Sequence, residues 1–322
     1  MTKPTTPLHA RTIVNTPAEV MVGIAYLAVS FMIFPAADAT GKVLVEWHGL
    51  SGGFVAFVRM VMQVVLVLPI VLVWKGRAAL ATGHLGLNLL RGIFLGLGGI
   101  AFFSGLGFMP LADATAVFMV EPMMVTLLAV PILDETIGRR RIAAIVVGFV
   151  GAMLIIQPSY AVFGLASLLP IAAALLISLY LILSRFVSGT TSPLAMMVYS
   201  GLGGALTCGV ALMIGGVSGV PALDPTPPES LTPYGLIVLL GLIGTVSHLM
   251  VIEAYRRAPA SVLAPFSYLE IVSAVVLGFL IFGDFPNGLK WLGMAVVVGS
   301  GLALYLLELR ASRRARPIHP TP

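Results

Sequence analysis

The sequence predicts an all-α, polytopic membrane protein with ten transmembrane helices, arranged as two inverted five-helix repeats. Three observations lead to this fold class: a strongly apolar composition, long apolar runs along the chain, and an internal repeat. Of the 322 residues, 59% are hydrophobic and only 10% are charged, and the mean hydropathy is +1.06. Soluble domains carry about 25% charged residues. Too few polar side chains remain to cover a surface facing water, so the solvent around this chain should be lipid.

Other compositional features exclude competing classes. A net charge of +5 can indicate nucleic-acid binding, but the charges form short clusters between apolar runs, so we expect no nucleic-acid partner. The single cysteine, Cys208, lies in an apolar run and is expected to be a buried, inert thiol. The segment before residue 20 lacks the short apolar core and small-residue cleavage site of a signal peptide, so we expect no cleaved leader.

Ten apolar runs of about 18–25 residues are long enough to cross a bilayer as helices. The expected spans are 20–42, 53–74, 87–109, 112–133, 140–157, 164–187, 193–215, 232–255, 261–283 and 288–309. The connections are short, apart from a small Pro-rich loop at 216–231. The expected division of the chain is a cytoplasmic N-terminal segment (1–19), a first repeat of five helices (20–158), a second repeat of five helices (164–309) and a basic cytoplasmic tail (310–322).

The positions of Lys and Arg predict the orientation of the spans. With the N-terminus inside, fourteen of the eighteen basic residues fall on the cytoplasmic side, only Lys42 and Lys290 fall outside, and Arg59 and Arg91 lie within spans. This is a strong positive-inside pattern, so both termini of this multi-pass protein should face the cytoplasm, with the spans in the inner (plasma) membrane. Because each half holds an odd number of spans, the two halves should cross the membrane in opposite senses.

An internal repeat supports the division into two halves. Residues 110–141 align with residues 259–290 without a gap, after a shift of 149 positions. Each copy holds one acid in the middle of an apolar run and a second acid just beyond its end; the paired positions are Glu121 with Glu270, Glu135 with Asp284, and Arg141 with Lys290. A long-period repeat in an apolar chain is typical of transporters with two homologous halves, which place substrate near the midplane between them.

Motifs within this frame resemble a known family. They are Asp38 and Lys42 in the first span, Arg59 in the second, PLADATAVFMVEP from Pro110, APASVLAPFSYLE from Ala258, and FGDFP after the ninth span. From about residue 20 to 309, the sequence resembles the drug/metabolite transporter superfamily, with two EamA-type halves. Members of that superfamily carry amino acids, nucleotide-like cofactors, sugars and drugs. The combination of Asp, Lys, membrane Arg and YLE is similar to the S-adenosylmethionine-type branch, and riboflavin-type and amino-acid members look close too.

The two repeated glutamates are the strongest site candidates. Glu121 and Glu270 each lie about ten residues into a span, roughly 15 Å deep and near the bilayer centre. A charge there costs about 2.5–3.5 kcal/mol on insertion scales, so it should face a cavity or a partner. Pro122 disfavours helix at Glu121, and a break there would free carbonyl groups to line a cavity. In the alternative interpretation, each glutamate joins two helices by an internal hydrogen bond.

Asp38, Lys42 and Arg59 form a second group of candidates. Asp38 and Lys42 are one helical turn apart on one face and can pair. Arg59 lies at the same depth in the second span as Asp38 in the first, so the two should come into contact. A guanidinium can grip a substrate carboxylate with two hydrogen bonds. A salt bridge that locks the first helix to the second is the structural alternative, which we weight equally.

Four weaker candidates complete the set. Tyr268, beside Glu270, can stack on a planar substrate or fill space in the bundle. His248 is more simply explained as a neutral histidine bonded to a neighbouring helix than as a proton relay. Arg91 is expected to snorkel to the inner headgroups, and Glu253 to pair with arginines at the cytoplasmic edge.

These features predict a secondary transporter that moves a small organic metabolite by alternating access. One alternative is an efflux exporter of amino acids or amphipathic drugs, and another is an intramembrane enzyme or lipid-handling protein. The sequence has no phosphate loop, nucleophile elbow or metal-ligand spacing, so we expect no enzyme activity, no cofactor and no metal site. The expected partners are the bilayer and a metabolite resembling S-adenosylmethionine, riboflavin or an amino acid. The glutamates permit proton coupling, and exchange or facilitated diffusion fits equally well.

Overall fold

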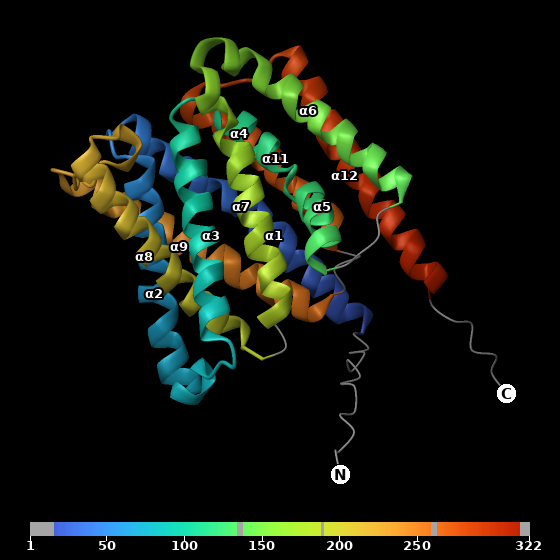
Figure 1. Ribbon diagram of the computed structural model, residues 1–322, viewed down its shortest axis with the longest axis horizontal. Coiled ribbons are helices and arrows are strands. Elements are labelled where there is room, and N and C mark those ends of the chain that lie inside the picture. Colours follow the sequence, from blue (N-terminus) through green and yellow to red (C-terminus); the bar gives the residue numbers. More distant parts are fainter. Residues whose placement is uncertain (1–15, 134–137, 188–189, 259–262, 316–322) are drawn as a thin grey trace.

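The computed structural model describes residues 16–133, 138–187, 190–258 and 263–315, which form helices joined by turns and, within these ranges, no β-strand (Figure 1). Short 3₁₀ segments, η3 (Gly164–Leu168) and η5 (Ala264–Tyr268), precede two of the helices. The α-helices are α1 (Pro17–Glu46), α2 (Gly52–Ile70), α3 (Leu85–Leu106), α4 (Leu111–Phe118), α5 (Glu121–Leu133), α6 (Arg139–Phe163), α7 (Leu169–Val187), α8 (Pro193–Ser218), α9 (Leu231–Arg257), α11 (Leu269–Phe282) and α12 (Gly288–Ala315).

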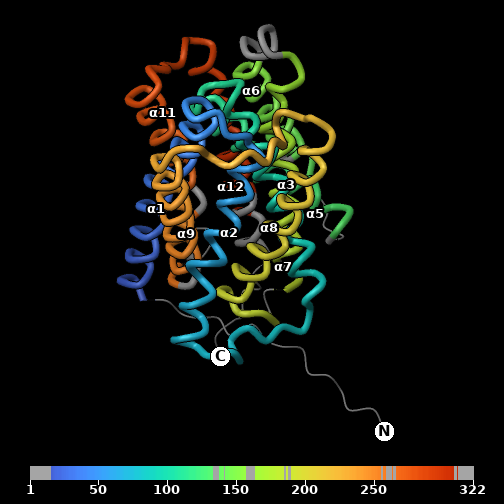
Figure 2. The backbone as a smooth tube through the Cα atoms, turned by 90° about the vertical axis from the view of Figure 1, so that its left-hand side faces the viewer, coloured from blue at the N-terminus to red at the C-terminus, as the bar shows by residue number. Residues whose placement is uncertain are grey.

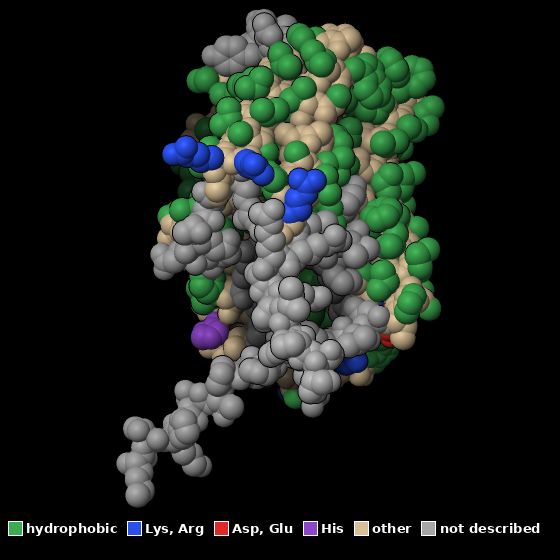
Figure 3. Space-filling view, turned by 90° about the vertical axis from the view of Figure 1, so that its right-hand side faces the viewer, with side chains coloured by type: hydrophobic (Ala, Val, Ile, Leu, Met, Phe, Trp, Pro, Cys, Tyr) green, Lys and Arg blue, Asp and Glu red, His purple; other side chains and the backbone are tan. Residues whose placement is uncertain are grey.

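These helices account for the ten predicted membrane spans. Within the described ranges, eight helical segments are long and apolar enough to cross a bilayer, with α4 and α5 counted as one, and the shorter apolar stretches Ile142–Ile156 and Phe266–Phe282 supply two more. Large hydrophobic side chains point outward: Val217 is 91% exposed and Met213 is 74% exposed. Hydrophobic side chains also cover most of the described part of the face in Figure 3. Exposed apolar surface on this scale requires lipid, so the prediction of an all-α polytopic membrane protein is confirmed.

Helices from the two halves of the chain interdigitate. α1 packs against α9, and α7 packs against α3; α6 packs against α12, and α2 against α8. The shift of 149 residues maps the first of these pairs onto the second and exchanges the members of the other two, so the packing pattern repeats across the halves. Figure 1 shows α6 and α12 side by side at one edge of the bundle, and Figure 2 shows α1 beside α9.

The α-helices α5 and α11 of the fourth and ninth spans begin at matching places. α4 ends at Phe118, the backbone turns through Met119 and Val120, and α5 begins at Glu121. In the second half, η5 precedes α11, and Glu270 lies in the first turn of α11. The Glu–Pro sequence explains the first break, because proline disfavours the α conformation in the residue before it and has no N–H to donate. The predicted break in the fourth span is found at Met119 and Val120, whereas Glu121 itself is helical, as the first residue of α5.

Candidate functional site

A cluster of charged side chains lies in the middle of the bundle and draws on both halves. Asp38 comes from α1, Arg59 from α2, Glu121 from the start of α5 and Glu270 from the start of α11. Arg59 interacts electrostatically with both Asp38 and Glu270, and Glu270 also interacts with Glu121. The structure therefore brings together two groups of candidates that the sequence predicted separately. We call these four residues the central cluster.

In the described part of the chain, hydrogen bonds and ion pairs do not engage the charged side chains of the central cluster. Asp38 and Glu270 are 2% and 5% exposed, whereas Arg59 and Glu121 are half-buried despite their depth. Among the described residues, no hydrogen bond or ion pair engages the side chains of Asp38, Arg59 or Glu270. The predicted direct contact between Asp38 and Arg59 is therefore wrong, because the two groups interact across a gap. Charged side chains held in this way remain available to a ligand.

Aromatic rings hold the guanidinium of Arg59 in place. Its central carbon lies 5.3 Å from the centre of the Phe34 ring and 5.7 Å from that of Phe103, within the range of cation–π contact. Gly244 on α9 leaves room beside it, since an added Cβ would lie 3.5 Å from Nε. Phe103 occupies the space left by Gly41 on α1, where a Cβ would collide with the ring. Neither ring was predicted as a site residue, because nothing in the sequence separates them from ordinary core aromatics.

Glu121 and Glu270 occupy matching helix positions. Each lies in the first turn of its α-helix, where the partial positive charge of the helix N-terminus favours a carboxylate. Ser178 on α7 reaches across the halves, and its Oγ donates to the backbone oxygen of Glu121 at 3.1 Å. The alternative in which each glutamate side chain joins two helices by a hydrogen bond is not found within the described residues. Glu135, the other acid of the first repeat, lies outside those residues.

Tyr268 and His248 extend the central cluster. Tyr268 is half-buried and interacts with Glu121. Its hydroxyl fills the space left by Gly301 on α12, where an added Cβ would collide with it. His248 on α9 is half-buried and lies within electrostatic range of Arg59. The expected hydrogen bond from His248 to a neighbouring helix is absent from the part of the chain that the structure describes.

Lys42 lies outside the central cluster, although it is on the same helix as Asp38. Its Nζ forms an ion pair with Glu46 and donates to the backbone oxygens of Leu106 at 3.1 Å and Met109 at 3.0 Å. The predicted pairing of Asp38 with Lys42 is therefore wrong. Carbonyl groups at the end of α3 lack partners within the helix, and they attract the ammonium group instead. Two of the three Lys42 contacts join α1 to the end of α3, and the third is to Glu46 on α1 itself.

Arg91 is buried rather than snorkelling, so that expectation is also wrong. Only 2% of the residue is exposed; Nε donates to Ser184 Oγ at 2.8 Å, and Nη1 donates to Asn88 Oδ1 at 3.0 Å. The guanidinium carbon lies 4.8 Å from the centre of the Tyr180 ring. Polar side chains on α3 and α7 thus replace the lipid headgroups as partners. Asn88, one turn before Arg91 on the same helix face, was the signal in the sequence.

The C-terminal end of α9 agrees with expectation. Glu253 pairs with Arg257 one turn further along α9, with Oε1 and Nη2 2.7 Å apart. The side chain of Arg256, the other expected partner, lies outside the described part of the structure. This pair joins residues of one helix in one half, and it serves below as a control.

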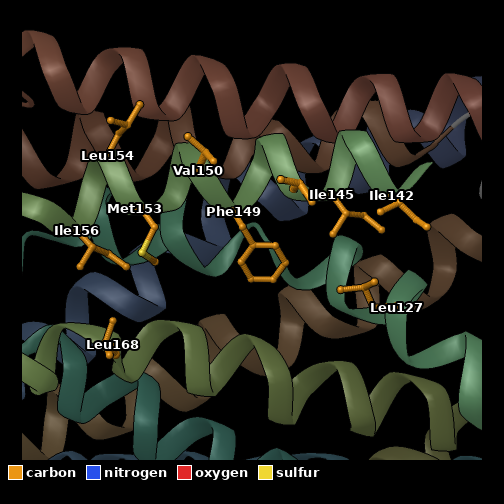
Figure 4. A pocket seen from close by; sticks show the side chains of 10 residues that line it. Leu127, Ile142, Ile145, Phe149, Val150, Met153, Leu154, Ile156 and Leu168 are labelled. Atoms are coloured by element: carbon orange, nitrogen blue, oxygen red, sulfur yellow. The ribbon is translucent and has the colours of Figure 1, made fainter. Parts of the chain in front are cut away.

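A wide apolar cavity lies away from the charges. Its volume is about 920 Å³, and it is lined by Leu127 of α5, Leu168 of η3 and a row of side chains from α6. Figure 4 shows the α6 side chains, Phe149 and Met153 among them, along the space between the helices. No charged residue lines this cavity, and a ligand site needs some well-placed polar groups. Across the described ranges, no group of three His, Cys, Asp or Glu residues is arranged to hold a metal ion.

Comparisons with known proteins identify relatives of the whole chain. A family model described as the EamA-like transporter family matches residues 21–157 and 164–306. The chain is 30% identical over 299 residues to a riboflavin transporter of Vibrio cholerae, covering 92% of this chain and 97% of that one. It is 27% identical to an S-adenosylmethionine uptake transporter of Rickettsia bellii, covering 90% and 95%. A chain of known crystal structure shares the fold at a TM-score of 0.59 and 17% identity, covering 91% and 98%.

The matches cover both halves of the chain. Each of the two segments that the family model matches contains one of the repeated glutamates, Glu121 or Glu270. The relatives align along nearly their full length, so the similarity is not limited to one motif. The resemblance noted from the sequence motifs is thereby confirmed. The chain belongs to the EamA-like transporter family.

Proposed function

We propose that this chain is a secondary transporter of the inner membrane that moves a small organic metabolite by alternating access. The central cluster carries the proposal, because both halves contribute charged side chains to it and those charges lack direct partners. Folds of this kind hold their substrate near the midplane, and the two halves rock around it. Residues 20–158 and 164–309 are the proposed moving halves. A cluster at mid-depth, built from both halves, favours passage of a solute over chemistry at the membrane surface.

The side chains around the central cluster favour a flat, polar metabolite of the riboflavin class. Phe34, Phe103 and Tyr268 supply aromatic surface, on which a planar ring system can stack. Arg59 offers hydrogen-bond donors and the carboxylates offer acceptors to the polar edges of such a ring. Apolar walls with a few convergent polar groups are the usual composition of a small-molecule site. The relatives named riboflavin transporters support the same choice.

An S-adenosylmethionine-like cation is the second candidate. The central cluster has three carboxyl groups and one guanidinium, so deprotonated acids would give it net negative charge. A sulfonium or ammonium group would be attracted to those carboxylates and to the faces of the rings. The relatives named S-adenosylmethionine uptake transporters fit this reading. The exporter alternative predicts amino acids or amphipathic drugs as substrates instead.

The test is substrate flux into proteoliposomes that contain the purified protein. Labelled riboflavin, S-adenosylmethionine and a set of amino acids are supplied in turn, and the flux is compared with that of Arg59→Gln. Glu253→Gln is the matched control, because it removes an ion pair at the cytoplasmic edge, far along the chain from the central cluster. We expect saturable riboflavin flux that Arg59→Gln loses and Glu253→Gln keeps. Saturable flux of only amino acids, or equal flux in empty liposomes, would overturn the proposal.

The proposed orientation places both termini in the cytoplasm and the loop at 221–229 outside. It rests on the positive-inside pattern, since fourteen of the eighteen basic residues fall on the proposed inner side. Reporter fusions at the C-terminus and within that loop measure it directly. A reporter active outside the membrane at the C-terminus would contradict this orientation.

A further inference from the structure

We propose that the end of the bundle opposite the proposed cytoplasmic face is a gate, formed by an ion pair between Asp113 and Lys290 and by a ring clamp on Phe282. The proposal rests on the alternating-access function above. It assigns these residues the task of keeping the outer mouth closed until substrate arrives. The contacts come from the ends of α1 and α11 and the beginnings of α4 and α12, which meet there.

The ion pair is the first part of the gate. Lys290 in the first turn of α12 pairs with Asp113 in the first turn of α4. The Asp113 side chain is 1% exposed and that of Lys290 is 14% exposed, so the pair is almost sealed from solvent. Asp284 lies close by, beside a small cavity of about 110 Å³. Breaking a buried pair leaves a charge without compensation, which makes the closed form depend on both partners.

The ring clamp is the second part. Phe282, the last residue of α11, meets Trp47 at the end of α1 edge to face, with 5.7 Å between ring centres. The Nζ of Lys42 lies 5.1 Å from the centre of the same Phe282 ring. Because backbone carbonyls at the end of α3 already fix Lys42, the clamp is rigid on the side of the first half. Both parts of the gate join the first half of the chain to the second.

The opposite end of the bundle lacks this gate in its sequence. After the shift of 149 positions, Val262 is the equivalent of Asp113, and Arg141 is the equivalent of Lys290. Leu133 is the equivalent of Phe282. Thr191 and Met196 stand in place of Lys42 and Trp47. The repeat thus offers no acid for the cation and no aromatic clamp. Since the halves are related by an inverted repeat, we infer that the ion pair and the ring clamp act at the outer end only.

Hydrogen bonds between the halves occur at both ends of the bundle. Ser51, which caps α2, donates from Oγ to the backbone oxygen of Asp224 at 2.7 Å. Ser192, which caps α8, donates from Oγ to the Ala79 oxygen at 3.0 Å. α2 and α8 are repeat counterparts, so these two bonds are equivalent. The inner end has further hydrogen bonds between the halves, from Thr82 and Asn88 to Thr191 and from Tyr199 to the backbone oxygen of Leu80. The outer end differs in kind, because an ion pair and a ring clamp hold it closed, whereas the inner end is joined by hydrogen bonds between uncharged groups.

Double electron–electron resonance tests the gate, with spin labels at His48→Cys and Gly288→Cys in a Cys208→Ala background. An added Cβ at Gly288 meets no neighbouring atom within 4 Å. The gate predicts one short distance in the otherwise unaltered protein. Lys290→Met should raise the ratio of long to short distances by about tenfold, the size of an ordinary coupling between sites. The charge exchange Asp113→Lys with Lys290→Asp should restore the short distance, and Glu253→Gln should leave it unchanged.

A second variant keeps the test decisive if the charge variants fail to insert. Phe282→Ala removes the ring without leaving a buried charge, and it should also increase the long distance. An unchanged distance distribution in a folded Lys290→Met or Phe282→Ala protein would overturn the gate. Flux measurements separate this failure from failure of the proposed function: without the gate, the unaltered protein still carries substrate, whereas without the function it carries none.

Discussion

The interior of this bundle contains two kinds of buried cation, and Arg59 and Arg91 represent them. Arg91 donates to Ser184 and Asn88 and lies against a tyrosine ring, so neighbouring side chains satisfy it. Arg59 rests between two phenylalanines, and its acids interact with it only across a gap. The hydrogen-bonded Arg91 acts as a structural clamp, because its bond to Ser184 holds α3 and α7 together. Arg59 and the nearby acids form a candidate binding site, because a ligand can supply the hydrogen-bond partners that they lack among the described residues.

The largest expected effect is that of Glu270→Gln, which should abolish transport or make its rate independent of the pH gradient. The amide keeps the size and much of the hydrogen bonding of the acid, so the protein should still fold and insert. It removes the charge and the proton that a coupled carrier would use. Flux in proteoliposomes, with and without an imposed pH gradient, measures the effect. If Glu270→Gln keeps the original rate and pH dependence, the glutamate belongs with the clamps.

Exchanging Asp38 and Arg59 tests whether these residues bind substrate or only hold two helices together. Because the two side chains do not touch, the double variant Asp38→Arg with Arg59→Asp restores no lost salt bridge. We expect it to insert and remain inactive, like either single variant. The comparison needs the amount of inserted protein and its flux, measured on the same samples. Full recovery of transport in the double variant would remove both residues from the site.

Glu121→Gln should affect turnover more than binding. Glu121 begins the second part of a broken span, where a change of backbone geometry can accompany rocking of the halves. We therefore expect nearly unchanged substrate affinity and a maximal flux that falls several-fold. Equilibrium binding and initial flux rates, measured side by side, give the two quantities. A large loss of affinity with normal maximal flux would reverse the roles that we give to Glu121 and Glu270.

The smallest expected effect comes from replacing either of two glycines on α12 by alanine. A Cβ at Gly301 would collide with the Tyr268 hydroxyl, whereas a Cβ at Gly299 meets nothing within 4 Å. Gly301→Ala should therefore displace Tyr268 and raise the apparent substrate KM by about tenfold, equivalent to about 1.4 kcal/mol. Gly299→Ala should change nothing. Tyr268→Phe removes the colliding oxygen, so combining it with Gly301→Ala should lessen the defect. Equal effects from both glycine variants would show that Tyr268 only fills space.

The sequence predicted those features that depend on spacing along the chain. Apolar run length predicted the spans, the Glu–Pro pair predicted the break before α5, and the repeat predicted that Glu121 and Glu270 share a position. Partners supplied by distant helices could not be predicted. Lys42 turns to the carbonyls at the end of α3, and Arg91 turns to Ser184 on α7. Both depend on neighbours that only the folded bundle brings within reach.

Substrate affinity and thermal stability, measured on the same variants, test most directly whether the central cluster is a binding site. Riboflavin binding and the midpoint of thermal unfolding are compared for Arg59→Gln and Arg91→Gln, with Ser184→Ala as a second clamp variant. Losing hydrogen bonds to a charged group costs about 1.5–3 kcal/mol, so Arg59→Gln should weaken binding by about tenfold or more and leave Tm unchanged. Arg91→Gln and Ser184→Ala should lower Tm and leave affinity unchanged. If Arg59→Gln lowers Tm without weakening binding, the central cluster is a clamp and the substrate binds elsewhere.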